Sequence, residues 1–165
     1  MNFVVDVEAD GPCPGLYSMV SIGVVELSTM KGFYNTLKPI SDHYQEDALK
    51  ACNFTRQETL KFDDSNIAMT RLNDWLNNFY GNKVFWSDNN GFDWQFVNYY
   101  FHLYDIKNPF GFSSRRIGDY YCGRVNDLSA NRKWKKLRKT KHTHNALDDA
   151  MGNAEALKQI MKGNY

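Results

Sequence analysis

Residues 2–8 form an apolar run that predicts a buried strand, yet two of its side chains are carboxylates. Asp6 and Glu8 lie two residues apart, so both side chains point to the same face of the strand. Val5 and Val7 point to the opposite face. Any fold for this chain must therefore place a pair of carboxylates on a strand that is otherwise apolar.

Three further side chains that suit the same chemistry lie far along the chain. Asp93 begins a predicted aromatic helix, and His144 and Asp149 begin the last predicted helix. Carboxylates that crowd together repel one another and take up protons. Hard divalent cations, which prefer oxygen ligands, remove that repulsion, and an imidazole accepts a proton near neutral pH. Acids gathered beside one histidine therefore indicate a metal-assisted hydrolase with a general base.

Each of these signals has a simpler explanation when it is taken alone. Asp-x-Glu is a common pair of solvated charges, and an acid in the first turn of a helix, such as Asp93, is favoured by the helix dipole. His144 and Asp149 are five residues apart, so they meet only if His144 precedes the helix and Asp149 projects from it. Asp148 remains an alternative acid, and His142 an alternative base.

The hydrophobic pattern along the rest of the chain predicts alternating strands and helices. The predicted strands are residues 2–8, 20–27, 31–37, 83–87 and 112–114. The predicted helices are residues 48–52, a short helix after Thr55, a helix from residue 65 that ends before Gly81, and residues 91–104, 116–124 and 145–161.

This order of elements predicts an α/β fold. Short turns between the first three strands favour an antiparallel meander, and the later strands alternate with helices, which favours parallel pairing. We therefore predict a mixed central sheet flanked by helices. A length of 165 residues fits one domain, residues 1–165.

One segment concentrates the positive charge of the chain. Residues 132–141 contain seven cations and no acid, whereas the whole chain has a formal net charge of +1, so the remainder carries −6. Runs of charge usually form solvated loops. This run includes Trp134 and directly precedes the candidate histidine, which favours contact with a phosphate backbone.

Several other functional classes leave no trace in the sequence. Cys13, Cys52 and Cys122 are odd in number and lack CxxC spacing, which argues against a disulfide framework or a structural zinc site. No stretch approaches the length of a membrane span, and no signal peptide begins the chain, so we expect a cytoplasmic protein without a membrane partner. There is no Gly-rich phosphate loop and no nucleophile elbow.

Taken together, these residues resemble the DEDDh superfamily of 3′–5′ exonucleases, which includes oligoribonuclease, ribonuclease T and small bacterial and phage exoribonucleases. The signature of that superfamily is Asp-x-Glu in the first strand, Phe-Asp in the middle and His-x-Ala-x-x-Asp near the end. The matching segments here are Asp6-Val7-Glu8, Phe92-Asp93 and His144-Asn145-Ala146-Leu147-Asp148-Asp149, in that order over nearly the full chain.

The resemblance implies a ribonuclease H-like fold and two divalent cations, Mg²⁺ or Mn²⁺. It selects Asp149 over Asp148 as a metal ligand and His144 over His142 as the general base that takes a proton from the attacking water. The complete ligand set implied is Asp6, Glu8, Asp93 and Asp149.

The implied activity is release of nucleoside 5′-monophosphates from the 3′ end of single-stranded nucleic acid or of 3′ overhangs. RNA is favoured over DNA on the resemblance alone. The alternatives are a 3′–5′ exodeoxyribonuclease of the proofreading or repair type, a catalytically silent module that binds nucleic acid, and a phosphatase for small nucleotides. Many members of the superfamily are homodimers, so a homodimer is one assembly to expect.

Two positions depart from the family pattern and bear on substrate contacts. Ala9 stands where the family often has Thr, which removes a hydroxyl contact to the terminal nucleotide but leaves a backbone N–H. Asp88 replaces a His that often precedes Asn89. The substrate contacts we expect are made by Ala9, Asn89, Phe92, Lys135, Lys136 and Lys139.

Overall fold

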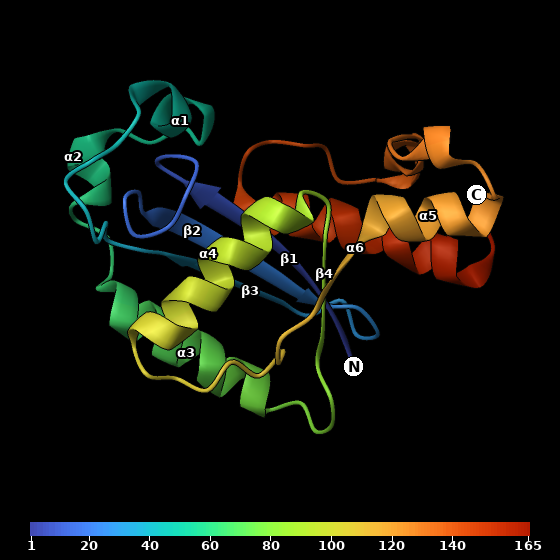
Figure 1. Cartoon of the computed structure of the whole chain (residues 1–165), viewed down its shortest axis with the longest axis horizontal. Helices are drawn as coiled ribbons and strands as arrows, with labels where there is room; N and C mark the ends of the chain where they lie inside the picture. Colours follow the sequence, from blue (N-terminus) through green and yellow to red (C-terminus); the bar gives the residue numbers. More distant parts are fainter.

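The computed structural model describes residues 1–165 and contains one five-stranded sheet with the strand order β3-β2-β1-β4-β5 (Figure 1). The strands are β1 (Asn2–Ala9), β2 (Met19–Glu26), β3 (Gly32–Thr36), β4 (Val84–Ser87) and β5 (Ser114–Arg116). The first three pair antiparallel, whereas β4 is parallel to β1 and β5 is parallel to β4. The predicted mixed sheet, with a meander followed by parallel strands, is confirmed.

Three of the six α-helices, α2, α3 and α6, begin after a residue whose side chain caps them. Thr55 accepts a hydrogen bond from the backbone of Glu58 and donates its own N–H to the Glu58 carboxylate, a complete capping box, and Asp64 caps the next helix. No helix combines the length and the apolar character needed to cross a membrane. The helices are α1 (Glu46–Ala51), α2 (Arg56–Thr59), α3 (Ser65–Asn77), α4 (Asn90–Leu103), α5 (Ile117–Val125) and α6 (Ala146–Lys162), with short 3₁₀ helices η1 (Leu128–Ala130) and η2 (Lys133–Leu137).

Helices cover both faces of the sheet, and β1 divides its side chains between them (Figure 1). Val5 and Val7 pack into one core with α3 and α4. Val4 packs into a second core with α5 and α6. Because side chains alternate along a strand, Asp6 and Glu8 share the second face with Val4 and lie on the side of the sheet that α6 covers.

The last strand lies two residues later than predicted. The last strand is Ser114–Arg116 rather than 112–114, because only these residues pair with β4, and Phe112 is 93% exposed. Trp134 is the one aromatic residue of the basic segment 132–141, and it does not reach the surface. Its side chain is fully buried in the core beside α6, and its indole N–H donates to Asn131 O at 3.0 Å.

A glycine in β2 sets how closely α6 approaches the sheet. Gly23 pairs with Asp6 across β1 and β2, and a Cβ atom at Gly23 would overlap the backbone of Ala146, the first residue of α6. The missing side chain therefore lets the first turn of α6 rest on the sheet beside Asp6. That turn carries Asp149.

We expect Gly23→Ala to lower the free energy of unfolding by about 1–3 kcal/mol, because the added methyl group overpacks the contact between β2 and α6. The measurement is urea denaturation. Gly123→Ala is the matched control, since nothing lies within 4 Å of a Cβ atom there, and alanine should be neutral or stabilising in α5. Equal losses of stability in both variants would contradict this account.

Candidate active site

Three carboxylates meet on the face of the sheet that α6 covers. β1 presents Asp6 and Glu8 to this face, and the first turn of α6 brings Asp149. One oxygen atom from each carboxylate lies within 4.8 Å of the others. The Asp149 side chain is 1% exposed, whereas the competing Asp148 faces solvent. The result is a compact acidic group that is mostly removed from water.

Asp93 approaches the same group from the first turn of α4. The parallel pairing of β1 with β4 ends at Val4 and Trp86, so the later part of β1 has no partner strand on that side. The backbone N–H of Val7 donates instead to Asp93 Oδ1 at 3.1 Å. Asp93 Oδ2 is buried and has no hydrogen-bond partner. An unpaired buried carboxylate oxygen next to other acids fits a metal ligand.

Burial and mutual repulsion raise the pKa values of these acids. The pKa of Asp6 lies well above its usual range because of burial first, and then because of the charges of Asp93, Glu8 and Asp149. Burial raises the pKa of Glu8 to about 7 and that of Asp93 well above its usual range, although hydrogen bonds oppose both shifts. Without a cation the group therefore retains protons, and its all-oxygen donor set suits Mg²⁺ or Mn²⁺.

The loop before α6 holds Asp149 in place and presents His144 beside it. His144 has a left-handed backbone, with φ of 56°, and its N–H donates to Asp149 Oδ2 at 3.0 Å. Asn145 caps α6 with its side-chain oxygen. The imidazole of His144 is half exposed, and its Nδ1 lies 3.9 Å from Glu8 Oε1. This position at the edge of the acidic group is suitable for a general base.

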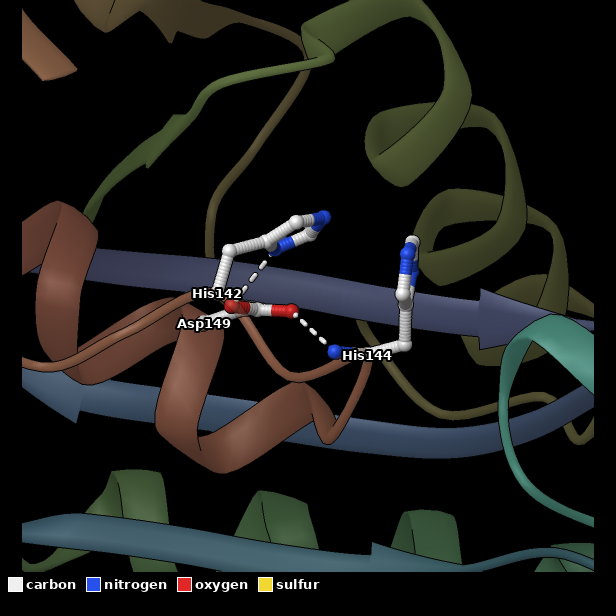
Figure 2. Close-up of side chains that lie close together, drawn as sticks. All are labelled: His142, His144 and Asp149. Atoms are coloured by element: carbon white, nitrogen blue, oxygen red, sulfur yellow. Dashed lines mark hydrogen bonds and ion pairs between the residues drawn. The ribbon is translucent and has the colours of Figure 1, made fainter.

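His142 contacts the other carboxylate oxygen of Asp149. Its Nδ1 is 2.7 Å from Asp149 Oδ1, and its ring centroid is 4.3 Å from that of His144. Figure 2 shows the His142 ring directed at the carboxylate, whereas His144 contacts Asp149 through its backbone and its imidazole points away. The two histidines therefore differ in their relation to Asp149.

Arg138 is a site residue that the sequence analysis missed. Its Nη2 lies 2.8 Å from Asp149 Oδ1, and its side chain is only 10% exposed. The guanidinium occupies space above Gly152, where a Cβ atom would overlap it. A glycine inside a helix costs about 1 kcal/mol relative to alanine. Gly152 in the last predicted helix was therefore the available signal of a close approach.

Cys52 is a second site residue that the sequence did not indicate. Its thiol lies 3.2 Å from Glu8 Oε2, to which it donates a hydrogen bond, and its side chain is buried. All three cysteines are free, as expected from their spacing. Cys52 thus helps to fix Glu8, and nothing in its sequence context indicated this contact.

The residues expected to contact substrate lie in different environments. Ala9 is 5% exposed and packs in the core, so only its backbone is available. Asn89 is exposed at the start of α4 and makes no capping bond with its side chain. Phe92 is half-buried and packs on Phe96, with ring centroids 5.0 Å apart.

The basic segment 132–141 lies beside the acidic group. Lys135, Lys136 and Lys139 are exposed, and Lys135 Nζ pairs with Asp88 Oδ2 at 2.5 Å. An open cavity of about 300 Å³ in this region has no hydrophobic lining residue. Its lining consists of Lys135, Arg138, Lys139, Thr140, Lys141 and His142. Since Arg138 and His142 also contact Asp149, this cationic cavity adjoins the acidic group.

Comparison with known proteins gives matches over nearly the whole chain. Residues 1–161 match the family described as the 3′-5′ exoribonuclease Rv2179c-like domain. The 3′-5′ DNA exonuclease Cap18 of Escherichia coli is 37% identical over 174 residues, which cover 96% of this chain and 90% of that protein.

Solved structures share the fold at low sequence identity. The nuclease domain of 3′hExo, a DEDDh family member bound to rAMP, has a TM-score of 0.74 at 16% identity and covers 98% of this chain and 92% of that one. Escherichia coli exonuclease I in complex with a dT13 oligonucleotide has a TM-score of 0.73 at 15% identity, over 99% of this chain but only 42% of that one. The predicted ribonuclease H-like fold is thereby confirmed.

Mn²⁺ should bind more tightly as the pH rises from about 6 to about 8, and binding should release protons, because the cation displaces protons that the raised pKa values retain. In the metal-free protein these acids contribute stability at low pH, where they are protonated, and that contribution is lost as the pH rises through their raised pKa values. Calorimetric titration in buffers of different ionisation enthalpy measures both the affinity and the protons.

Glu8→Gln should weaken Mn²⁺ binding and reduce proton release. Asp47→Asn is the control, because that side chain is 100% exposed on α1 and its loss should change neither quantity. Affinity that stays constant over this pH range, with no proton release, would argue against these acids as ligands.

Proposed function

Since the chain belongs to the family of 3′-5′ exoribonuclease Rv2179c-like domains and is a 3′-5′ exonuclease, we propose that it releases nucleoside 5′-monophosphates from the 3′ ends of single-stranded RNA. One observation carries the proposal: carboxylates from three distant segments converge beside the imidazole of His144. A 3′–5′ exodeoxyribonuclease is the second candidate, because the 37% identical Cap18 is a DNA exonuclease.

The acids that would hold two divalent cations, Mg²⁺ or Mn²⁺, are Asp6, Glu8, Asp93 and Asp149. The unpaired Oδ2 of Asp93 and the raised pKa values of Asp6 and Glu8 support this ligand set. When bound, such cations neutralise phosphate charge and stabilise the attacking and leaving oxygens of an in-line displacement.

His144 would act as the general base. Its half-exposed imidazole lies beside Glu8 and can accept a proton from the attacking water. The water oxygen forms a bond to phosphorus while the bond to the 3′ oxygen breaks, and that oxygen takes a proton from solvent. The product is a nucleoside 5′-monophosphate. Arg138 would keep Asp149 oriented, through the contact between Nη2 and Oδ1.

The remainder of the strand would cross the cationic cavity beside Asp149. Lys135, Lys136 and Lys139 are exposed there and would contact successive phosphates. At the terminal nucleotide, the proposed contacts are the backbone of Ala9, the free side chain of Asn89 and the accessible edge of Phe92.

The decisive experiment is a time course on RNA and DNA strands of matched sequence, labelled at the 5′ end, with Mg²⁺ or chelator. We expect a ladder that shortens from the 3′ end, requires the cation and proceeds faster on RNA. His144→Ala should lower kcat by about 10²–10⁴-fold, because a positioned base contributes that much. His102→Ala, at the exposed far end of α4, is the matched control.

Each outcome separates the candidate functions. Faster shortening of DNA would favour the exodeoxyribonuclease. Binding without product would leave a silent module, and immediate release of labelled mononucleotide would reverse the polarity. Wild-type turnover by His144→Ala would show that His144 is not the general base.

Neutralising the cavity should weaken binding of long strands. Replacing Lys135, Lys136 and Lys139 together by alanine should raise KM and reduce the slope of log KM against log salt by about 2, since each phosphate contact to a single strand contributes about 0.7. The measurement is KM for a long strand over a range of salt concentrations.

The control for this prediction is a triple variant with the same change of charge at exposed lysines elsewhere, namely Lys61, Lys107 and Lys162. That variant should retain the wild-type slope. A slope that falls equally in both variants would show that net charge alone, and not this cavity, determines the salt dependence.

A further inference from the structure

Beside the acidic group lies a second potential ligand set of different chemistry. His142, His144 and Asp149 each offer a ligand atom, and these atoms lie within 4.8 Å of one another (Figure 2). His142 has no part in the proposed reaction, yet its Nδ1 is directed at Asp149 Oδ1 from 2.7 Å.

The donor atoms distinguish this set from the one proposed for Mg²⁺ or Mn²⁺. Asp6, Glu8 and Asp149 offer only oxygen, whereas the second set offers two imidazole nitrogens and one carboxylate oxygen. Oxygen donors suit Mg²⁺ and Mn²⁺, whereas imidazole suits zinc, copper and nickel. Three protein ligands with one open position are typical of accessible zinc sites.

The second set combines one fixed ligand with two adjustable ones. Asp149 is 1% exposed and is held by Arg138 and by the backbone N–H of His144. The imidazoles of His142 and His144 are 57% and 48% exposed, so they can rotate toward a common ion without disturbing the core. Coordination through Nδ1 of His142 requires that this ring turn to open its 2.7 Å contact with Asp149 Oδ1 and that the ring proton reside on Nε2, the other neutral tautomer.

We propose that His142, His144 and Asp149 bind a zinc-type transition metal ion and that this ion switches the exonuclease off. Asp149 belongs to both ligand sets, so occupancy by zinc excludes the productive arrangement, and zinc also occupies the nitrogen of the base. The inhibition, but not the binding, rests on the proposed function, in which Asp149 is a metal ligand and His144 is the base.

Binding can be tested without substrate, with Co²⁺ as a coloured substitute for zinc. Metal-free protein should develop visible absorption on addition of Co²⁺ and lose it on addition of Zn²⁺. His142→Gln should weaken this binding at least about tenfold, because loss of even a supporting contact typically costs that much. His142 is exposed, so the variant should fold normally. Asp6→Asn should retain the signal, because Asp6 lies outside the set, and His102→Gln is the matched control.

Inhibition is tested with zinc in the Mg²⁺-supported assay, each protein being compared with its own rate without zinc. His142→Gln should require at least about tenfold more zinc for half inhibition, in line with the binding loss. Unchanged zinc sensitivity in His142→Gln, or loss of the Co²⁺ signal in Asp6→Asn, would overturn the proposal. A normal Co²⁺ response in a protein without exonuclease activity would instead leave the metal site standing and refute the proposed function.

Discussion

Repulsion between buried carboxylates is the constraint on which this molecule depends. Three separate segments bring Asp6, Glu8, Asp93 and Asp149 together, and the only guanidinium that contacts this group is that of Arg138. Charges removed from water cost stability unless they are paired or neutralised. Two hydrophobic cores, one on each face of the sheet, offset that cost and hold the acids where solvation alone would separate them.

The topology explains why the acids converge at this point. β1 has an antiparallel neighbour on one side and a parallel neighbour on the other, and its pairing with the parallel neighbour β4 ends at Val4. In the remaining half of β1, backbone groups on that side are free to bond to helix side chains. The N–H of Val7 is one of them, and it donates to Asp93. Sites in α/β sheets commonly form where the strand order changes direction in this way.

The sequence predicted what depends on local periodicity. Two-residue spacing placed Asp6 and Glu8 on one face, and the capping box at Thr55 marked a helix start. Residue spacing could not choose between Asp148 and Asp149, because the choice depends on which side of α6 rests on the sheet, and the structure buries Asp149 there. Nor could spacing distinguish Arg138 from the other cations of the basic segment. Its side chain points inward because Gly152, which has no Cβ atom, leaves room for the guanidinium.

The ion pair between Arg138 and Asp149 preforms part of the proposed cation site. A permanent positive charge already neutralises part of Asp149, and backbone N–H groups hold the same carboxylate. The Asp149 side chain should therefore keep its position whether or not an ion is bound, so little free energy is spent on reorienting it when an ion binds. Cations bound as proposed would therefore enter and leave a carboxylate that is already held in position.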